Sequence, residues 1–210
     1  MITVTANLKG GSGKSTVTFN LCVWLQHKGE TVIAYDLDPQ MTLNDVAMIR
    51  KEEGVEPFLD VNMIDDDQYV YKLSNHAGHV LVDVGASNIE AMRAALSVAE
   101  RVIIPVPPSQ PDVWATQRFL KIIEEVCVDN KPELIAFINR ADTHHSITES
   151  DEAEEALLQL NNITVLPHRL CQRTSFRRTL SEGLSIFELS KKSKSAIEFD
   201  SLACALYPDL

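Results

Sequence analysis

The sequence predicts an α/β fold in which helices cover both faces of a doubly wound, mostly parallel sheet. Short runs of continuous apolar residues alternate with helix-like segments along the whole chain, a pattern typical of repeated βαβ units. A glycine-rich turn follows the first apolar run. The 210 residues contain no internal repeat and no linker. At roughly 100–200 residues per domain, we expect a single domain over residues 1–210.

In the first half of the chain, strand-like runs are bounded by glycine or proline, which interrupt regular structure. The run at 31–36 lies between Gly29 and Pro39, and the run at 79–84 ends at Gly85. The predicted order is strand 2–8, helix 14–28, strand 31–36, helix 42–53, an acidic helix start or loop at 65–67, strand 79–84 and helix 89–99.

In the second half, one helix-like segment concentrates acidic residues near its start, where the helix dipole favours negative charge. These acids are Glu149, Asp151, Glu152, Glu154 and Glu155. The predicted order is strand 102–106, helix 112–128, strand 134–139, helix 149–160, a short strand at 163–166, and helices at 174–182 and 188–206.

Charge is distributed unevenly along the chain. The formal net charge of −11 argues against a protein that coats nucleic acid with its whole surface. Residues 168–194 nevertheless carry +5, which leaves −16 on the remainder. These seven bases form either a local electropositive patch or a pair of solvated helix faces. They are Arg169, Arg173, Arg177, Arg178, Lys191, Lys192 and Lys194.

The cellular compartment is predicted from what the sequence lacks. Its apolar runs are far shorter than the ~18 residues that span a bilayer, and the stretch before Lys9 is too short for a secretory signal. The four cysteines are scattered, without a C-x-x-C pair. We therefore expect reduced thiols in the cytoplasm, with neither a disulfide framework nor a zinc site.

The strongest chemical signal is the glycine-rich turn between the first strand and the first helix. It reads Lys9-Gly10-Gly11-Ser12-Gly13-Lys14-Ser15-Thr16. Glycines let successive backbone N–H groups surround phosphate oxygens, and the helix N-terminus adds partial positive charge. Lys14 can reach the outer phosphates, and the Ser15 hydroxyl can ligate Mg²⁺. The turn therefore predicts a nucleotide site.

The turn departs from the general pattern G-x-x-x-x-G-K-[ST], because Leu8 replaces the first glycine and Lys9 stands beside it. This form resembles the deviant phosphate loop of the ParA/MinD family of ATPases. The resemblance implies ATP and Mg²⁺ as cofactors and slow, partner-stimulated hydrolysis. It also implies an ATP-sandwich homodimer, in which Lys9 contacts the partner's nucleotide much as an arginine finger does.

Two further blocks resemble motifs of that family. Residues 36–40 read Asp-Leu-Asp-Pro-Gln and match D-x-D-P-Q, and Asp83 ends an apolar strand as the Walker B aspartate does. By resemblance, Asp38 positions or activates the attacking water, whereas Asp36, Asp83 and Ser15 belong to the metal site. Alone, each acid is more often an ordinary strand-end residue. The implied catalytic residues are Lys9, Lys14 and Asp38.

The resemblance covers nearly the whole chain. Asn139 and Arg140 fall where the family meets the adenine base. The implied nucleotide contacts are Lys9, Gly10, Gly11, Gly13, Lys14, Ser15, Thr16, Asn139 and Arg140. The proline-rich segment 105–111 resembles a dimer-interface segment, and the implied interface residues are Lys9, Pro105, Pro108 and Pro111. Residues 173–187 resemble the C-terminal pattern of small partition ATPases, and no helix-turn-helix is expected before the first strand.

The first functional hypothesis is a positioning switch on the nucleoid. The ATP-bound dimer would bind duplex DNA without sequence preference through the seven bases above. A small ParB-like or McdB-like adaptor would stimulate hydrolysis and release. The chain resembles both small plasmid-partition ATPases of the ParF kind and McdA-type carboxysome-positioning ATPases, so the cargo stays open between a plasmid, a chromosome origin and a protein body.

Two other hypotheses stay open. A MinD-like membrane-cycling ATPase would end in a basic amphipathic helix. Residues 195–210, however, carry three acids and no base, so we expect this tail to pack on the sheet and no membrane to be bound. A metabolic ATP-dependent enzyme on the same scaffold would need a substrate pocket or paired exposed cysteines, which the sequence does not reveal.

Overall fold

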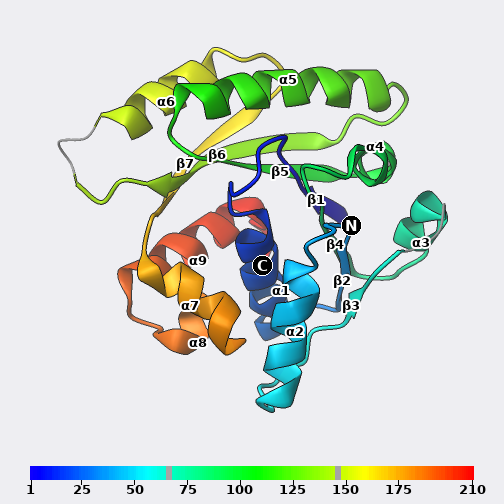
Figure 1. Ribbon diagram of the computed structural model, residues 1–210, viewed down its shortest axis with the longest axis vertical. Helices are drawn as coiled ribbons and strands as arrows, with labels where there is room; N and C mark the ends of the chain where they lie inside the picture. Colours follow the sequence, from blue (N-terminus) through cyan, green and yellow to red (C-terminus); the bar gives the residue numbers. More distant parts are fainter. Residues whose placement is uncertain (65–67, 145–147) are drawn as a thin grey trace.

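A parallel sheet of seven strands forms the centre of the computed structural model, which describes residues 1–64, 68–144 and 148–210 (Figure 1). The strand order is β3-β2-β4-β1-β5-β6-β7, and every strand pairs in parallel with its neighbours. The strands are β1 (Ile2–Thr5), β2 (Val32–Asp36), β3 (Val61–Asn62), β4 (His79–Asp83), β5 (Arg101–Val106), β6 (Glu133–Ala141) and β7 (Thr164–Cys171). Later strands are added on both sides of β1, each after a connecting helix. The helices therefore cover the central strands on both faces.

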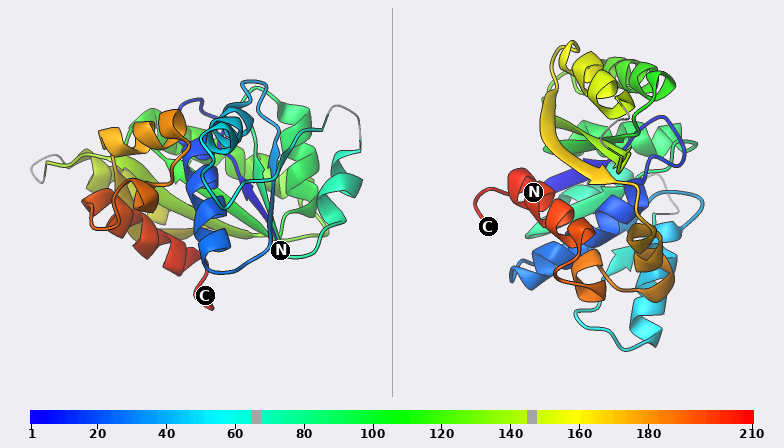
Figure 2. Two further views of the ribbon diagram at one scale, coloured as in Figure 1. Left: turned by 90° about the horizontal axis from the view of Figure 1, so that it is seen from below. Right: turned by 90° about the vertical axis from the view of Figure 1, so that its left-hand side faces the viewer.

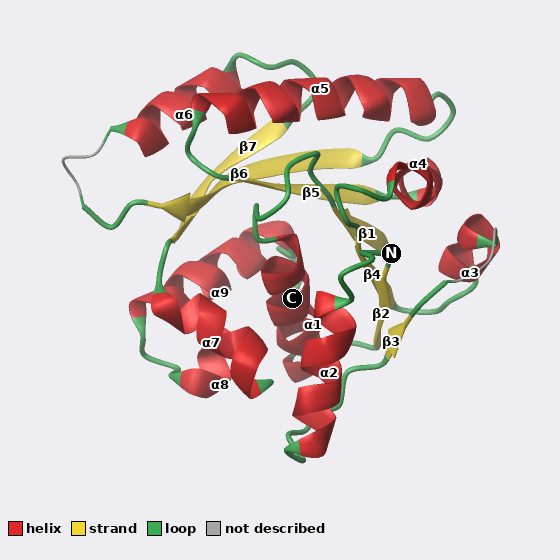
Figure 3. Ribbon diagram, viewed as in Figure 1, coloured by secondary structure: helices red, strands yellow, loops and turns green. Residues whose placement is uncertain are grey.

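Two groups of helices cover the two faces of the sheet, as the two further views show (Figure 2) and as the colouring of helices and strands makes plain (Figure 3). One face carries α3 (Tyr69–Ser74), α4 (Ile89–Val98), α5 (Gln110–Val126) and α6 (Glu149–Leu158). The other carries α1 (Lys14–His27), α2 (Thr42–Glu52), α7 (Thr174–Glu182), α8 (Ile186–Leu189) and α9 (Lys194–Leu206). Each face has its own apolar core. The predicted doubly wound α/β fold is therefore confirmed.

The predicted elements correspond to observed ones, with differences at their ends. The first strand ends at Thr5 rather than at residue 8, because the chain turns away into the glycine-rich loop. The short strand predicted at 163–166 extends to Cys171. The sequence analysis missed β3 and α3, which are too short to show a hydrophobic period. The acidic stretch predicted at 65–67 lies outside the described residues.

The helix predicted at 188–206 is two helices separated at Ser190–Ser193. Ser193 caps α9, and its side chain accepts a hydrogen bond from the backbone N–H of Ala196. The apolar side of α9, including Phe199 and Leu206, is fully buried in the core with α1. The prediction that this tail packs on the sheet is confirmed. No helix in the described part of the chain is both long and apolar enough to cross a membrane.

A buried ion pair ties α2 to the segment from α7 to α8. The side chain of Arg50 is completely buried, and its guanidinium donates two hydrogen bonds of 2.8 Å to the carboxylate of Glu188. It also donates to the carbonyls of Gly183 and Pro57. Burial raises the pKa of Glu188, but hydrogen bonds from Arg50, Ser185 and His27 outweigh this effect and hold the pKa at about 2.

Glu188→Gln is expected to destabilise the protein by about 3 kcal/mol at pH 7, because it leaves the buried Arg50 charge uncompensated. The folded pKa lies below the unfolded one, so the stabilisation exists above the unfolded pKa. It is lost as pH falls through about 2. Urea unfolding of both proteins should therefore show midpoints that converge below pH 4.5. Equal midpoints at pH 7 would show that Glu188 does not stabilise the fold.

Candidate functional site

The loop from β1 to α1 lies at the carboxyl edge of the sheet, where open α/β proteins bind ligands. Gly11 and Gly13 have φ of 76° and 90°, a left-handed conformation that glycine adopts without strain. Gly13 is the N-cap of α1, and no side chain caps this helix. The first backbone N–H groups of α1 are therefore left for an anion.

Asn139 braces this loop from β6. Its amide Nδ2 donates a hydrogen bond of 2.6 Å to the carbonyl of Ser12. A Cβ at Gly13 would lie 2.3 Å from the same Nδ2 atom, so a larger residue there would displace the Asn139 side chain. The register of β6 against β7 shifts at Asn139, and Arg140 has a positive φ of 60°. Such irregularities re-aim side chains at functional sites.

Lys14 is buried beneath the loop and bonded to it. Its side chain Nζ donates a 3.2 Å hydrogen bond to the carbonyl of Lys9. Burial lowers the pKa of Lys14, whereas the charges of Asp83 and Asp38 raise it. The ammonium is thus held in a concave site with few competing partners, where phosphate oxygens would compensate its desolvation.

Asp36 and Asp83 end neighbouring strands and are paired in the sheet register. One carboxylate oxygen of Asp36 accepts from the N–H of Asp38 at 3.1 Å, and the other accepts from the N–H of Asn44 at 2.9 Å. Burial raises the pKa of Asp36, and these hydrogen bonds lower it. Asp36 therefore shapes the loop that leads into α2.

The carboxylate of Asp83 has different surroundings from that of Asp36. It is completely buried, and neither carboxylate oxygen has a hydrogen-bond partner of ordinary geometry among the described residues. Burial raises its pKa to about 7, the nearby Ser15 hydroxyl and Lys14 lower it, and the charge of Asp36 adds to the increase. An orphaned carboxylate beside a hydroxyl fits a hard divalent cation.

A metal ion here would need ligands from a bound nucleotide. The described residues contain no group of three or more His, Cys, Asp or Glu side chains that could hold a metal by themselves. Mg²⁺ usually binds one or two carboxylates together with phosphate oxygens and waters. Asp83 and Ser15 therefore fit Mg²⁺ brought in with a nucleotide better than a resident metal.

Asp38 lies at the open side of the same site. It lines a cavity together with Lys14 and Ser15, and its Oδ1 accepts a 3.0 Å hydrogen bond from the backbone N–H of Gln40. A Cβ at Gly85 would lie 2.6–2.9 Å from the Asp38 carboxylate. The absence of a side chain at Gly85 lets this carboxylate reach its place.

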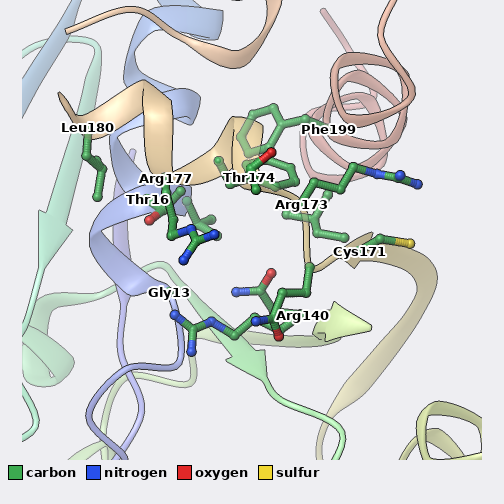
Figure 4. A pocket seen from close by; sticks show the side chains of 14 residues that line it. Gly13, Thr16, Arg140, Cys171, Arg173, Thr174, Arg177, Leu180 and Phe199 are labelled. Atoms are coloured by element: carbon green, nitrogen blue, oxygen red, sulfur yellow. The ribbon is translucent and has the colours of Figure 1, made fainter. Parts of the chain in front are cut away.

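Two adjoining cavities form one cleft beside α1. The first follows the loop and is lined by residues 10, 11 and 13–16, by Asp38 and by Ala86 and Ser87. The second, of about 290 Å³, lies between β6, β7 and α7 and is lined by Asn139, Phe176 and Phe199, among others (Figure 4). The two share Gly13, Thr16, Arg140 and Leu180. The cleft therefore joins a phosphate-sized site to a partly apolar one.

Lys9 extends away from the cleft towards α5. Its Nζ lies 3.6 Å from the carboxylate of Asp112, and its side chain is 45% exposed. Asp112 is held in turn by the side chain of Ser109, the N-cap of α5. Of the prolines predicted at a dimer interface, Pro108 and Pro111 reach the surface, whereas Pro105 is buried within β5.

The seven bases between 169 and 194 do not form one free surface. Arg169 is paired with Asp151 and Glu154 of α6, on the far face of the sheet from α7. Arg173 is paired with Glu198, and Arg178 with Glu182. The remaining four have no acidic partner among the described residues; they are Arg177, Lys191, Lys192 and Lys194.

The sequence analysis missed several residues of the site, among them Asp112, Gly85 and, for the nucleotide cleft, Arg177. The spacing of Ser109 and Asp112 is that of a capping box, a signal that could have indicated the acid near Lys9. No sequence signal places Gly85 against Asp38 or Arg177 over the cleft, because both contacts join segments distant in the chain.

Residues 3–186 match the family described as the CobQ/CobB/MinD/ParA nucleotide binding domain. The chain belongs to this family. Its match covers the loop, the two aspartates at the strand ends, the first cavity and the lining of the second except Phe199. The resemblance to the ParA/MinD family, which the deviant loop indicated, is confirmed. The cleft is that of a nucleotide-binding protein with the fold of the P-loop ATPases.

Curated relatives and solved structures agree with this assignment. The chain is 29% identical over 198 residues to maintenance of carboxysome distribution protein A of Halothiobacillus neapolitanus, covering 92% of this chain and 89% of that protein. It is 26% identical to protein ParA of Rhizobium radiobacter, covering 100% and 97%. A plasmid partition protein of Borrelia burgdorferi, bound to AMPPNP, superposes with a TM-score of 0.78 at 15% identity, over 100% of this chain and 99% of that one. At this identity the last comparison shows the fold alone.

Proposed function

We propose that this chain is an ATP hydrolase that acts as a dimerising switch and distributes a cargo over the nucleoid. The observation that carries the proposal is the second lysine of the loop, Lys9, which extends outwards beside a cleft lined by Lys14 and Asp38, with Asp83 buried next to it. Related proteins named for carboxysome distribution and for chromosome partitioning support a positioning role. A plasmid, a chromosome origin and a protein body are the candidate cargoes, and a ParB-like or McdB-like adaptor would stimulate turnover.

Mg²⁺ enters this proposal as the ion that accompanies ATP. Ser15 and Asp83 would hold it, because the Ser15 hydroxyl lies beside the buried Asp83 carboxylate and both groups are hard oxygen ligands. Asp36 would contribute indirectly, since its oxygens are occupied by backbone N–H groups. When bound, the ion neutralises charge on the outer phosphates.

Lys9→Ala is expected to bind MgATP but to stay monomeric. In the structure the Lys9 ammonium lies beside Asp112, and in the proposed dimer it would leave this carboxylate for the partner's nucleotide. Light scattering with saturating MgATP should show a dimer for the parent and a monomer for the variant. Lys121→Ala, on α5 away from the loop, is the control and should dimerise as the parent does. If Lys9→Ala dimerised with the affinity of the parent, Lys9 would not act across a dimer interface, and the chain would resemble an ordinary P-loop protein.

The proposed DNA surface rests on Lys191, Lys192 and Lys194, which are exposed and have no acidic partner among the described residues. Two protomers would offer about six phosphate contacts, which gives a log–log salt slope of about −5 on duplex DNA, with little sequence preference. A monomer should bind poorly, because it offers only about half of these phosphate contacts while its net charge of −11 opposes binding.

Replacing all three lysines by alanine is expected to weaken ATP-dependent DNA binding by at least tenfold and to flatten the salt slope, while dimerisation persists. Mobility shifts on arbitrary duplex, with and without ATP, measure both effects. Arg178→Ala is the matched control, because its guanidinium is already paired with Glu182. Equal retention of DNA by the parent and the triple variant would remove this surface from the proposal.

A further inference from the structure

Arg177 differs from the other arginines of the basic segment. Arg169, Arg173 and Arg178 each have a carboxylate within 2.9 Å, whereas Arg177 has no acidic partner in the described ranges 1–64, 68–144 and 148–210. A cation left unpaired in a chain with 30 acidic residues is available to an anionic ligand.

The position of Arg177 on α7 points to that ligand. Arg177 lines the second cavity with Gly13 and Thr16, the residues that begin α1. Figure 4 shows its side chain extending from α7 into the cavity, on the same side as the guanidinium of Arg140. Arg178, one residue further along α7, is turned to Glu182 instead. Only one of these two neighbouring arginines therefore faces the cleft.

Arg140 approaches the same region from the sheet. Its positive φ and the register shift of β6 direct it into the cleft, and it lines both cavities. A non-glycine residue in this conformation carries a local cost that persists at functional sites. Arg140 thus lies where the two cavities meet, together with Gly13 and Thr16, and Arg177 lines the second cavity on the α7 side.

The shape of the cleft indicates which part of a nucleotide would lie where the two cavities meet. The outer phosphates belong in the cavity of Lys14 and Ser15, so the ribose and base must extend into the second cavity, which holds Phe176 and Phe199. The inner phosphate then lies where the cavities meet, beside Thr16 and within the region that Arg177 lines. Lys14 would contact the outer phosphates, at the opposite end of the triphosphate.

We propose that Arg177 is a nucleotide-binding residue that recognises the inner phosphate and does not belong to the DNA surface. The inference rests on nucleotide binding at the phosphate loop. Guanidinium suits this task because its fixed, planar donors match phosphate oxygens. Arg177 would thereby link α7 to nucleotide occupancy of the cleft.

The test is the affinity for MgADP, which keeps dimerisation out of the measurement. Arg177→Ala is expected to weaken MgADP binding by about tenfold, the usual loss for one charged hydrogen-bonding group. Arg177→Lys should recover part of the loss, and Arg178→Ala should stay within about twofold of the parent. AMP, measured by competition, should lose affinity by the same factor as MgADP, because both ligands carry the inner phosphate.

Parent affinity for MgADP in Arg177→Ala would overturn the inference, as would a loss of DNA retention at unchanged MgADP affinity. A loss for MgADP without a loss for AMP would also overturn it, because it would place the contact on the outer phosphate. Lys14→Ala separates this inference from the proposed function. If Lys14→Ala fails to bind MgADP while Arg177→Ala binds normally, the nucleotide site stands and the assignment of Arg177 alone fails.

Discussion

Lys14→Ala is expected to abolish nucleotide binding, with an affinity for MgATP and MgADP at least about 100-fold below that of the parent. Lys14 is the buried cation of the loop, and among the described residues its Nζ donates a hydrogen bond to the Lys9 carbonyl alone. A charged group that meets more than one phosphate oxygen contributes roughly 1.5–3 kcal/mol for each hydrogen bond it makes. Calorimetric titration at neutral pH measures the loss directly.

The fold should tolerate this substitution. Burial lowers the pKa of Lys14, so the charged form is disfavoured in the folded state, and removing it should leave the unfolding free energy unchanged or higher. The exposed Lys51→Ala on α2 is the matched control and should bind MgADP as the parent does. Near-parent affinity in a folded Lys14→Ala protein would defeat the assignment of the phosphate loop.

The sequence could predict the parts of the site that depend on local chemistry. The loop from Lys9 to Thr16 needs glycines at fixed positions, and Asp36 and Asp83 follow apolar strands, so both signals lie within short segments. The parallel order of β2 and β4 then brings the two aspartates together. The doubly wound fold followed for the same reason, because each βαβ unit carries its own pattern.

The remaining features depend on contacts between distant segments. Arg173 is not free, because Glu198 on α9 pairs with it, whereas the direction of α7 turns Arg177 into the cavity. A count of charges along the sequence shows neither contact. The net charge of +5 counted over residues 168–194 is therefore larger than the positive charge that is free to bind an anion. In the same way Lys9 meets Asp112, about one hundred residues along the chain, only because β1 and β5 are neighbours in the sheet.

Asp38→Ala is the substitution expected to separate ATP binding from hydrolysis. Asp38 lines the phosphate cavity, and its carboxylate accepts a hydrogen bond from the backbone N–H of Gln40 at the open edge of the site. Its removal leaves the loop, Lys14 and Asp83 in place. We expect MgATP affinity within a few-fold of the parent and turnover at least about 100-fold lower, because a positioned carboxylate supplies 10²–10⁴-fold in proton transfer.

The same variant should accumulate as an ATP-bound dimer, since binding and dimerisation do not require the attacking water. Light scattering and phosphate release, measured on one sample, test both statements. Asp45→Ala, an exposed acid on α2, is the control and should turn over ATP at the parent rate.

Gly85→Ala provides a second route to the same answer, because a methyl group there would meet the Asp38 carboxylate at 2.6–2.9 Å and displace it without removing it. Its turnover should fall while MgATP binding persists. Hydrolysis at the parent rate by Asp38→Ala would exclude Asp38 as the group that prepares the water. A fall in turnover in Gly85→Ala alone would then point to the backbone between β4 and α4 as the element that controls hydrolysis.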